Sequence, residues 1–315
     1  MPHPFANRAK GWATRRPVRS VGSVVSSSSM SSKTWKEYLL SSGVPLEYSA
    51  IRIFEELGIM NPGEYRYERK TESGLPQVFS VDVQATQYDV GRELYIDCLV
   101  ECKYRHDETN WVFTPRNYGE FFSPNFADLF VTLDQCCTDR QLGRTILGRF
   151  ESKYPLCSKG IELLPRDANP KAIEQAIQQL RYAVVARSIE CIDDQLFYSP
   201  KMTVPIWVII PIIVTTASLW RLKVGTSLED ARNAEDIKAV ADPHDVLVLL
   251  QEPDHLDKQD TRTRFRDAFN DDQRATLNSL LHQSQNGGLS LFIGTLSTRR
   301  PSGLSDGASS YPLWC

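Results

Sequence analysis

The feature that most restricts the fold is an almost unbroken apolar stretch at residues 204–220, which contains Trp207, Pro211 and Trp220. It is just short of the ~20 apolar residues that a membrane-spanning helix needs. Its two prolines and many β-branched residues also disfavour a helix. Continuous apolar residues are typical of strands that are buried on both faces of a sheet. We therefore expect one or two core strands and no association with a membrane.

Another strand is predicted at residues 94–104, where polar and apolar positions alternate. Successive side chains of a strand point to opposite faces, so Glu101 and Lys103 emerge side by side. A carboxylate and an ammonium group fixed on a rigid strand suit a metal-and-water site. The alternative is an ordinary ion pair on an exposed sheet face, and spacing alone favours neither interpretation. The opposite, apolar face consists of Leu94, Ile96, Cys98, Val100, Cys102 and Tyr104.

The preceding residues 78–85 also alternate, and they predict the first strand of a hairpin. Residues 86–93 contain the turn-forming residues expected of its loop. The polar face would carry Asp82 between two uncharged polar residues. The apolar face would consist of Phe79, Val81, Val83 and Ala85.

The hairpin would bring two carboxylates together. Neighbouring strands lie ~4.8 Å apart, so Asp82 can approach Glu101 across the gap. Asp97 shares a face with Glu101 but lies about 13 Å along the strand, too far for one ion to bridge. We therefore expect Asp97 to be a peripheral charge or a strand-end residue. Paired carboxylates without nearby Cys or His ligands favour a hard ion, so Asp82 and Glu101 are predicted to hold Mg²⁺ or Mn²⁺ beside Lys103.

This order of elements resembles the PD-(D/E)xK, or restriction-endonuclease-like, nuclease superfamily. In that family a helix with an acid precedes a hairpin with an Asp, a strand with Glu-x-Lys, another helix and another strand. Asp82 in Val-Asp-Val-Gln-Ala matches the family's Asp, and Glu101-Cys102-Lys103 matches Glu-x-Lys. The resemblance covers roughly residues 40–222. It implies an α/β fold with a mixed central β-sheet flanked by helices, and Mg²⁺-dependent cleavage of DNA in which Lys103 orients or activates water.

The family's leading helix corresponds to residues 44–58, in which Pro45 suits the first turn and Gly58 the C-terminal end. Glu47 flanks the apolar face of this helix. By resemblance Glu47 is the helix acid, and it joins the three strand residues as the predicted catalytic set. The alternative is a carboxylate stabilised by the positive end of its own helix.

A second amphipathic helix is predicted at residues 171–187, where it would cover the sheet. Gln178 and Tyr182 lie one turn apart, similar to the Gln-x-x-x-Tyr element of some branches of the superfamily. The resemblance implies that both contact the substrate. Arg105, which follows the Glu-x-Lys strand, is a further predicted substrate contact. Because glutamines are common on helix surfaces, a purely structural role for Gln178 is the alternative.

Residues 1–34 contain no acid and are rich in Arg and Ser, so we expect a disordered leader before a nuclease-like core at 35–222. Such a composition can mimic a mitochondrial transit peptide. Met30 is also a plausible start, in which case the leader would be translated upstream sequence. We favour the second explanation.

The core is interrupted at residues 105–168 by an aromatic-rich segment with a predicted helix near 138–150. This helical and aromatic insert would either shape substrate choice or extend the core. Residues 223–286 predict a C-terminal helical extension with a short strand at 245–250. Residues 287–315 are rich in Gly, Ser and Pro, and they predict a flexible tail.

The composition is ordinary for a soluble protein, but its net charge of −3 does not indicate nucleic-acid binding. Basic residues near the predicted site and in the insert can still form a local groove for phosphates. The alternative for those residues is a solvated helix face. Seven cysteines without metal-ligand spacing indicate a reducing compartment, and we expect the cytoplasm.

The sequence thus predicts a metal-dependent endonuclease that hydrolyses DNA phosphodiester bonds. The alternative is a non-catalytic nucleic-acid-binding or interaction module on the same fold. A third hypothesis is a membrane-associated interaction protein built on residues 204–220. A homodimer is compatible with the first hypothesis, since cutting both strands of DNA often requires two sites.

Overall fold

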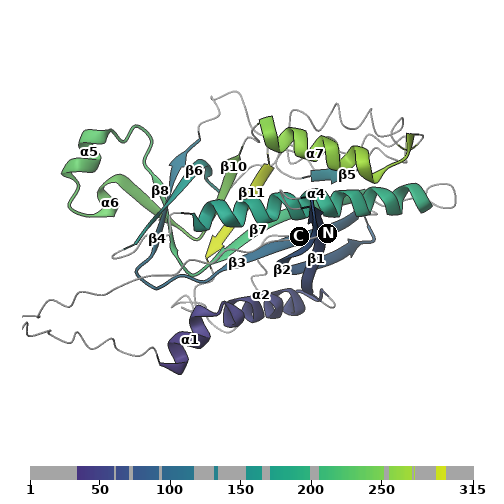
Figure 1. Ribbon diagram of the computed structural model, residues 1–315. Coiled ribbons are helices and arrows are strands. Elements are labelled where there is room, and N and C mark those ends of the chain that lie inside the picture. Colours follow the sequence, from purple (N-terminus) through teal and green to yellow (C-terminus); the bar gives the residue numbers. More distant parts are fainter. Residues whose placement is uncertain are drawn as a thin grey trace, which may run out of the picture.

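The computed structural model shows a mixed α/β fold in which helices pack against an 11-stranded sheet (Figure 1). The sheet contains both parallel and antiparallel pairs, in the order β1-β2-β3-β7-β11-β10-β6-β4-β8-β9. The residues that the structure describes are 34–59, 62–70, 74–91, 94–116, 131–133, 154–164, 171–198, 206–251, 255–271, 273 and 289–295.

The sheet has two mixed halves, because β10 and β6 pair only through Val248↔Leu156 and Leu249↔Cys157. The first half contains β1 (Gly63–Lys70), β2 (Pro76–Asp89), β3 (Leu94–Lys103), β7 (Ile206–Thr215), β11 (Leu289–Thr295) and β10 (Val246–Gln251), and β5 (Val131–Leu133) pairs with β7. The second half contains β6 (Leu156–Leu163), β4 (Asn110–Pro115), β8 (Ser218–Leu222) and β9 (Ala241–His244).

The apolar stretch forms strands, as predicted: β7 lies between β3 and β11, and β8 follows it. Ile209 and Ile213 pack into the core on one face of the sheet, and Val208 and Ile210 pack on the other. Pro211 lies between the part of β7 that pairs with β5 and the part that pairs with β11. A residue without an N–H is tolerated at such a break in the ladder. No helix in the described part of the chain is long and apolar enough to cross a membrane.

Helices cover both faces of the first half of the sheet (Figure 1). The long helix α4 (Ala172–Tyr198) lies on one face, where its predicted apolar stripe is buried. Helix α2 (Val44–Glu56) lies on the other face and contacts β2 and β3. The remaining helices are α1 (Trp35–Ser41), α5 (Leu228–Asn233), α6 (Ile237–Val240) and α7 (His255–Ala268).

The limits of α2 follow from its sequence and agree with the prediction. Its N-cap is Gly43, whose φ of 83° is accessible to glycine at little cost. Pro45 occupies the first turn, where a missing N–H costs nothing. Gly58, with φ of 79°, follows the C-terminal end.

The structure corrects three predicted segments. Residues 105–168 are more than an insert, because β4, β5 and β6 in this range pair within the sheet. In residues 223–286 the strand predicted at 245–250 is confirmed as β10, but this strand and the unpredicted β9 belong to the sheet, so the segment is more than a helical extension. Residues 289–295 of the predicted flexible tail form β11, which pairs with β7 and β10. The leader up to residue 33 and the predicted helix near 138–150 lie outside the described residues.

Candidate active site

The candidate site lies where strands β2 and β3 separate. Their antiparallel pairing ends at Val83↔Val100. Beyond this point β3 continues along β7, from Glu101↔Ile213 to Lys103↔Thr215, whereas the first part of β2 pairs with β1. A fork therefore opens between the strands, next to Glu101.

A bulge in β2 lies at this fork and corrects the predicted alternation. Residues 81–84 of β2 oppose residues 63–65 of β1, so β2 carries one extra residue. Val81 packs on the α4 side of the sheet, whereas Val83 packs against α2. The apolar residues of β2 thus do not share one face. Asp82 is the residue at which the strand changes sides.

Asp82 is held against β3 by its own carboxylate. Its Oδ2 accepts a hydrogen bond of 2.6 Å from the backbone N–H of Cys102, the residue between Glu101 and Lys103. Burial raises the pKa of Asp82, while the Cys102 N–H and the Lys103 ammonium group act in the opposite direction. The fork thus brings the acid of β2 beside the Glu-x-Lys element of β3.

Glu101 and Lys103 form a largely buried ion pair on the α4 side of the sheet. Lys103 Nζ lies 2.5 Å from Glu101 Oε1, and the side chains are 19% and 2% exposed. Lys103 Nζ also donates to Gln179 Oε1 of α4 at 3.0 Å. Side chains from two elements therefore fix the position of the ammonium group, which still reaches solvent.

The second oxygen of Glu101 is unsatisfied. Oε2 is buried and has no hydrogen-bond partner among the described residues. Burial raises the pKa of Glu101 to about 7; Lys103 opposes this shift, whereas Asp82 and Glu47 add to it. An unsatisfied buried carboxylate oxygen is costly, and a bound cation would satisfy it.

Glu47 belongs to the same electrostatic cluster. Burial raises its pKa, Asp82 and Glu64 raise it further, and Lys103 lowers it. Glu47 lies in the first turn of α2, and its Oε1 would be 3.1 Å from a Cβ atom at Gly43. The carboxylate thus lies over the positive end of its own helix. The structure therefore supports this structural interpretation and also places Glu47 near the site.

The predicted pair on α4 is only partly positioned toward the site. Gln178 is exposed, and its neighbour Gln179 is the residue that contacts Lys103. Successive helix residues differ by about 100° in direction, so the orientation of α4 decides which glutamine faces the strand. The ring of Tyr182 is covered by Arg69, whose guanidinium carbon lies 3.7 Å from the ring centroid.

Arg105 has structural partners, and its contact with a substrate stays a prediction. Its Nε lies 3.2 Å from Oε2 of the buried Glu162, and its Nη1 donates to the backbone oxygen of Tyr104. Glu162 also accepts a hydrogen bond from Trp111 Nε1 at 3.1 Å. Arg105 therefore keeps the buried carboxylate of Glu162 paired.

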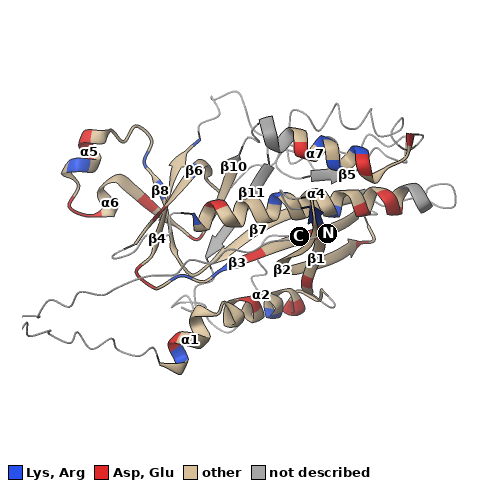
Figure 2. Ribbon diagram, in the orientation of Figure 1, with Lys and Arg blue, Asp and Glu red and all other residues tan. Residues whose placement is uncertain are grey.

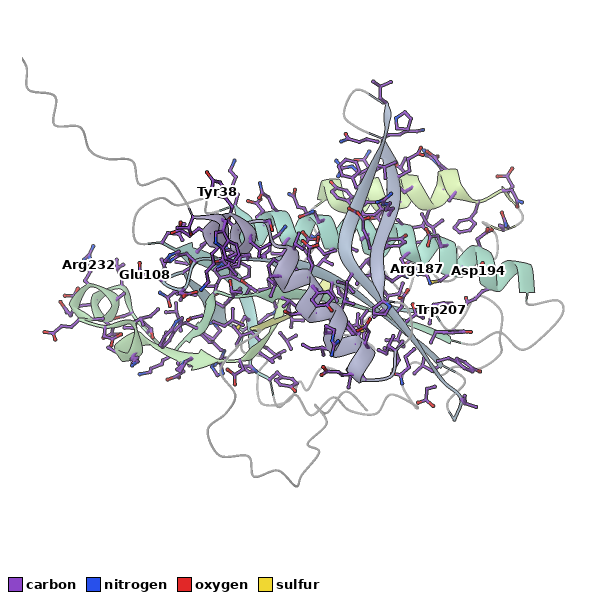
Figure 3. All side chains as sticks on the ribbon, turned by 90° about the horizontal axis from the view of Figure 1, so that it is seen from below. Tyr38, Glu108, Arg187, Asp194, Trp207 and Arg232 are labelled. Atoms are coloured by element: carbon purple, nitrogen blue, oxygen red, sulfur yellow. The ribbon has the colours of Figure 1, made fainter. Side chains whose placement is uncertain are left out.

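Asp97 is neither peripheral nor at a strand end, and the structure corrects this prediction. It is completely buried. Its carboxylate accepts hydrogen bonds from Gln84, Thr86 and Arg187. The guanidinium of Arg187 in turn lies 4.9 Å from the ring centroid of Trp207, and both residues are labelled in Figure 3. Thr86 was predicted to lie in the hairpin loop, but β2 extends to Asp89 and Thr86 pairs with Asp97.

In the described part of the chain, a divalent cation at this site would have two carboxylates as ligands, those of Asp82 and Glu101. Within the described ranges, no three His, Cys, Asp or Glu side chains are grouped so that they could hold a metal ion. Mg²⁺ is commonly bound by one or two carboxylates and completes its shell with water and substrate phosphates. The orphaned Oε2 of Glu101 and the adjacent carboxylate of Asp82 fit this mode of binding.

The chain matches no protein-family model, no curated protein and no solved structure. The geometry of the fork and the order of its residues are therefore the basis for its proposed function.

Proposed function

We propose that this protein is a metal-dependent endonuclease that hydrolyses DNA phosphodiester bonds at the fork between β2 and β3. The observation that carries the proposal is the buried, unsatisfied carboxylate of Glu101 next to the ammonium group of Lys103 and the carboxylate of Asp82. Such an arrangement is costly for stability and useful for metal-assisted hydrolysis. The choice of DNA as substrate comes from the resemblance to PD-(D/E)xK nucleases.

Asp82 and Glu101 would hold Mg²⁺ or Mn²⁺. When bound, the cation would stabilise negative charge on a phosphoryl oxygen and lower the pKa of a water ligand. Asp82 is held in place by the Cys102 N–H, and Glu101 is fixed by Lys103, so neither carboxylate has to reorganise. Such preorganisation is the main contribution that a protein makes to this chemistry.

Lys103 would orient the attacking water or the scissile phosphate. An ammonium group has three donors, and two of those of Lys103 are used by Glu101 and Gln179. The third N–H of Lys103 can donate a hydrogen bond to a substrate oxygen, because the side chain is partly exposed. Gln179 acts as a positioning residue by holding Nζ. Glu47 supports the site through the field that it adds at Asp82 and Glu101.

The test is a cleavage assay on single-stranded, double-stranded and branched DNA, with EDTA, Mg²⁺ or Mn²⁺. Lys103→Ala is expected to abolish cleavage while the protein stays folded, because it removes the donor next to the metal. Lys159→Ala is the matched control, since Lys159 is exposed on β6 in the second half of the sheet.

Each result of this assay has a clear meaning. Metal-dependent cleavage by a folded Lys103→Ala variant would refute the assigned mechanism. A wild-type protein that binds DNA but does not cut it with either metal would favour the alternative, a binding module on the same fold.

A further inference from the structure

Two arginines meet on one tyrosine next to the candidate site. Arg69 comes from β1 and Arg264 from α7, and both contact Tyr182 of α4. The guanidinium carbon of Arg69 lies 3.7 Å from the Tyr182 ring centroid and 5.3 Å from that of Phe79. Arg264 Nη1 donates to the backbone oxygen of Tyr182 at 3.3 Å, with its guanidinium carbon 6.0 Å from the ring centroid. Three elements thus hold the two cations together.

In the part of the chain that the structure describes, neither Arg69 nor Arg264 forms an ion pair with a carboxylate. Burial lowers the pKa of Arg264 and the charge of Arg69 lowers it further, although Asp260, one turn earlier on α7, acts in the opposite direction. Two partly desolvated cations in contact with the same residue are unfavourable unless an anion neutralises them.

The arginine pair is connected to the candidate site by two short paths. On α4, Tyr182 is three residues from Gln179, a rise of ~4.5 Å on nearly the same face. Gln179 Oε1 accepts from Lys103, and its backbone oxygen accepts from the Tyr67 hydroxyl at 3.2 Å. On β1, Tyr67 and Arg69 are two residues apart, about 6.6 Å on the same face. The arginines therefore lie roughly one helical turn beyond the contact between Gln179 and Lys103.

We propose that Arg69 and Arg264 form a clamp for a backbone phosphate of the DNA strand, next to the scissile phosphodiester. This inference rests on the proposed nuclease function. Guanidinium groups bind phosphate oxygens through paired N–H donors, and stacking on an aromatic ring fixes their plane in advance. Since DNA advances ~3.4 Å per nucleotide along one strand, a separation of about one helical turn corresponds to one or two nucleotides.

The clamp also changes the role of Tyr182. The contact with Arg69 covers its ring, so the ring does not offer a free surface on which a base could stack. Tyr182 is instead a positioning residue, which holds Arg69 with its ring and Arg264 with its carbonyl group. Figure 2 shows that α7, with its basic positions in blue, runs beside α4.

The clamp is tested by binding, without any need for cleavage. Fluorescence anisotropy of a labelled DNA duplex is measured in EDTA at several salt concentrations, with Arg69→Gln, Arg264→Gln and the double variant. Each single variant is expected to weaken binding about tenfold or more, because one charge-assisted contact is lost. The slope of log K against log salt should fall by about 1 for each arginine removed.

Matched controls exist on the same two elements. Arg66 of β1 is 71% exposed and pairs with Glu64, and Arg262 of α7 is exposed. Arg66→Gln and Arg262→Gln should therefore leave the affinity and the salt slope unchanged. If Arg69→Gln fails to fold, Arg264→Gln alone carries the test, because Arg264 donates its hydrogen bond to the backbone carbonyl group of Tyr182 and to no side chain of the described residues.

The outcomes separate the clamp from the nuclease proposal. If a folded double variant binds DNA with the wild-type affinity and slope while the wild-type protein cleaves, the clamp is wrong and the nuclease proposal stands. If the double variant loses affinity but the wild-type protein never cleaves, the clamp stands and the nuclease proposal fails. If inorganic phosphate binds in an arginine-dependent manner but DNA does not, the assignment to a DNA phosphate is overturned.

Discussion

At the scale of single residues, Asp97 and Glu101 show how two carboxylates on one face of β3 can have opposite roles. Both are buried. Donors from three side chains, including Arg187, satisfy Asp97, whereas one oxygen of Glu101 remains without a partner in the described part of the chain. A buried charge whose hydrogen bonds are all made stabilises a fold or leaves its stability unchanged. A buried charge that lacks a hydrogen-bond partner reduces the stability. The spacing of the two acids could not separate them, because the deciding donor, Arg187, lies on α4.

The unsatisfied carboxylate predicts an unusual pH dependence. The pKa of Glu101 is about 7 in the folded protein, above its ordinary value of 4.5. The folded state thus holds the proton more tightly than the unfolded state. Its contribution to stability is complete below pH 4.5 and is lost as the pH rises through 7. At pH 8 without metal, the ionised Glu101 should cost on the order of 3 kcal/mol.

Urea unfolding of the metal-free protein between pH 5 and pH 8 measures this cost, with Glu101→Gln as the reference, because it cannot ionise. The variant should become more stable relative to the wild type as the pH rises. Mg²⁺ should narrow the difference by stabilising only the wild-type protein. Parallel stability profiles for the two proteins would contradict this account of Glu101.

At the scale of elements, the bulge in β2 lies where two ordinary strands separate into a fork. The bulge moves Asp82 out of the regular ladder, and its side chain accepts from the Cys102 N–H. In the proposed mechanism one carboxylate therefore has two tasks, because it satisfies a backbone donor and would also offer an oxygen to a cation. Substitutions that separate these tasks should separate stability from metal binding.

Asp82→Asn and Asp82→Ala make this separation. The amide oxygen of Asn can still accept from Cys102 N–H, so Asp82→Asn should change the free energy of unfolding by less than about 1 kcal/mol. Asp82→Ala leaves that N–H unpaired and should cost about 1–3 kcal/mol. Both variants should lose Mn²⁺ binding, measured by calorimetry, because the charge is gone. Wild-type Mn²⁺ affinity in Asp82→Asn would exclude Asp82 as a ligand.

Local patterns in the sequence predicted most of the elements that carry this site. Three patterns agree with the structure: the alternation at 94–104, the proline and glycine at the ends of α2, and the apolar stripe of α4. Each of them depends on residues that are close in sequence. The bulge in β2 was not predictable in this way, because it is defined by the pairing with β1. The partners of Arg105 and the choice of Gln179 over Gln178 likewise depend on contacts between distant elements.

At the scale of the whole molecule, the order of strands is the feature furthest from sequence patterns. The sheet brings together β3, β7 and β11, whose residues lie at 94–103, 206–215 and 289–295. The composition after residue 287 predicted a flexible tail, yet β11 pairs in parallel with β7 and antiparallel with β10. Composition indicates the conformation that a segment prefers in isolation. In the folded protein, pairing with the otherwise unpaired edges of β7 and β10 overrides that preference.

The position of β11 predicts the effect of shortening the chain. A chain that ends at residue 286 lacks β11, which leaves unpaired backbone groups along β7 and β10 in the middle of the sheet. We expect it to aggregate or to lose cooperative unfolding. A chain that ends at residue 300 keeps β11 and is the matched control, with an expected melting transition close to that of the full chain. Calorimetry and size-exclusion chromatography compare the two. If the shorter chain is monomeric and unfolds cooperatively, β11 is dispensable. The fold that contains the fork would then not depend on the tail.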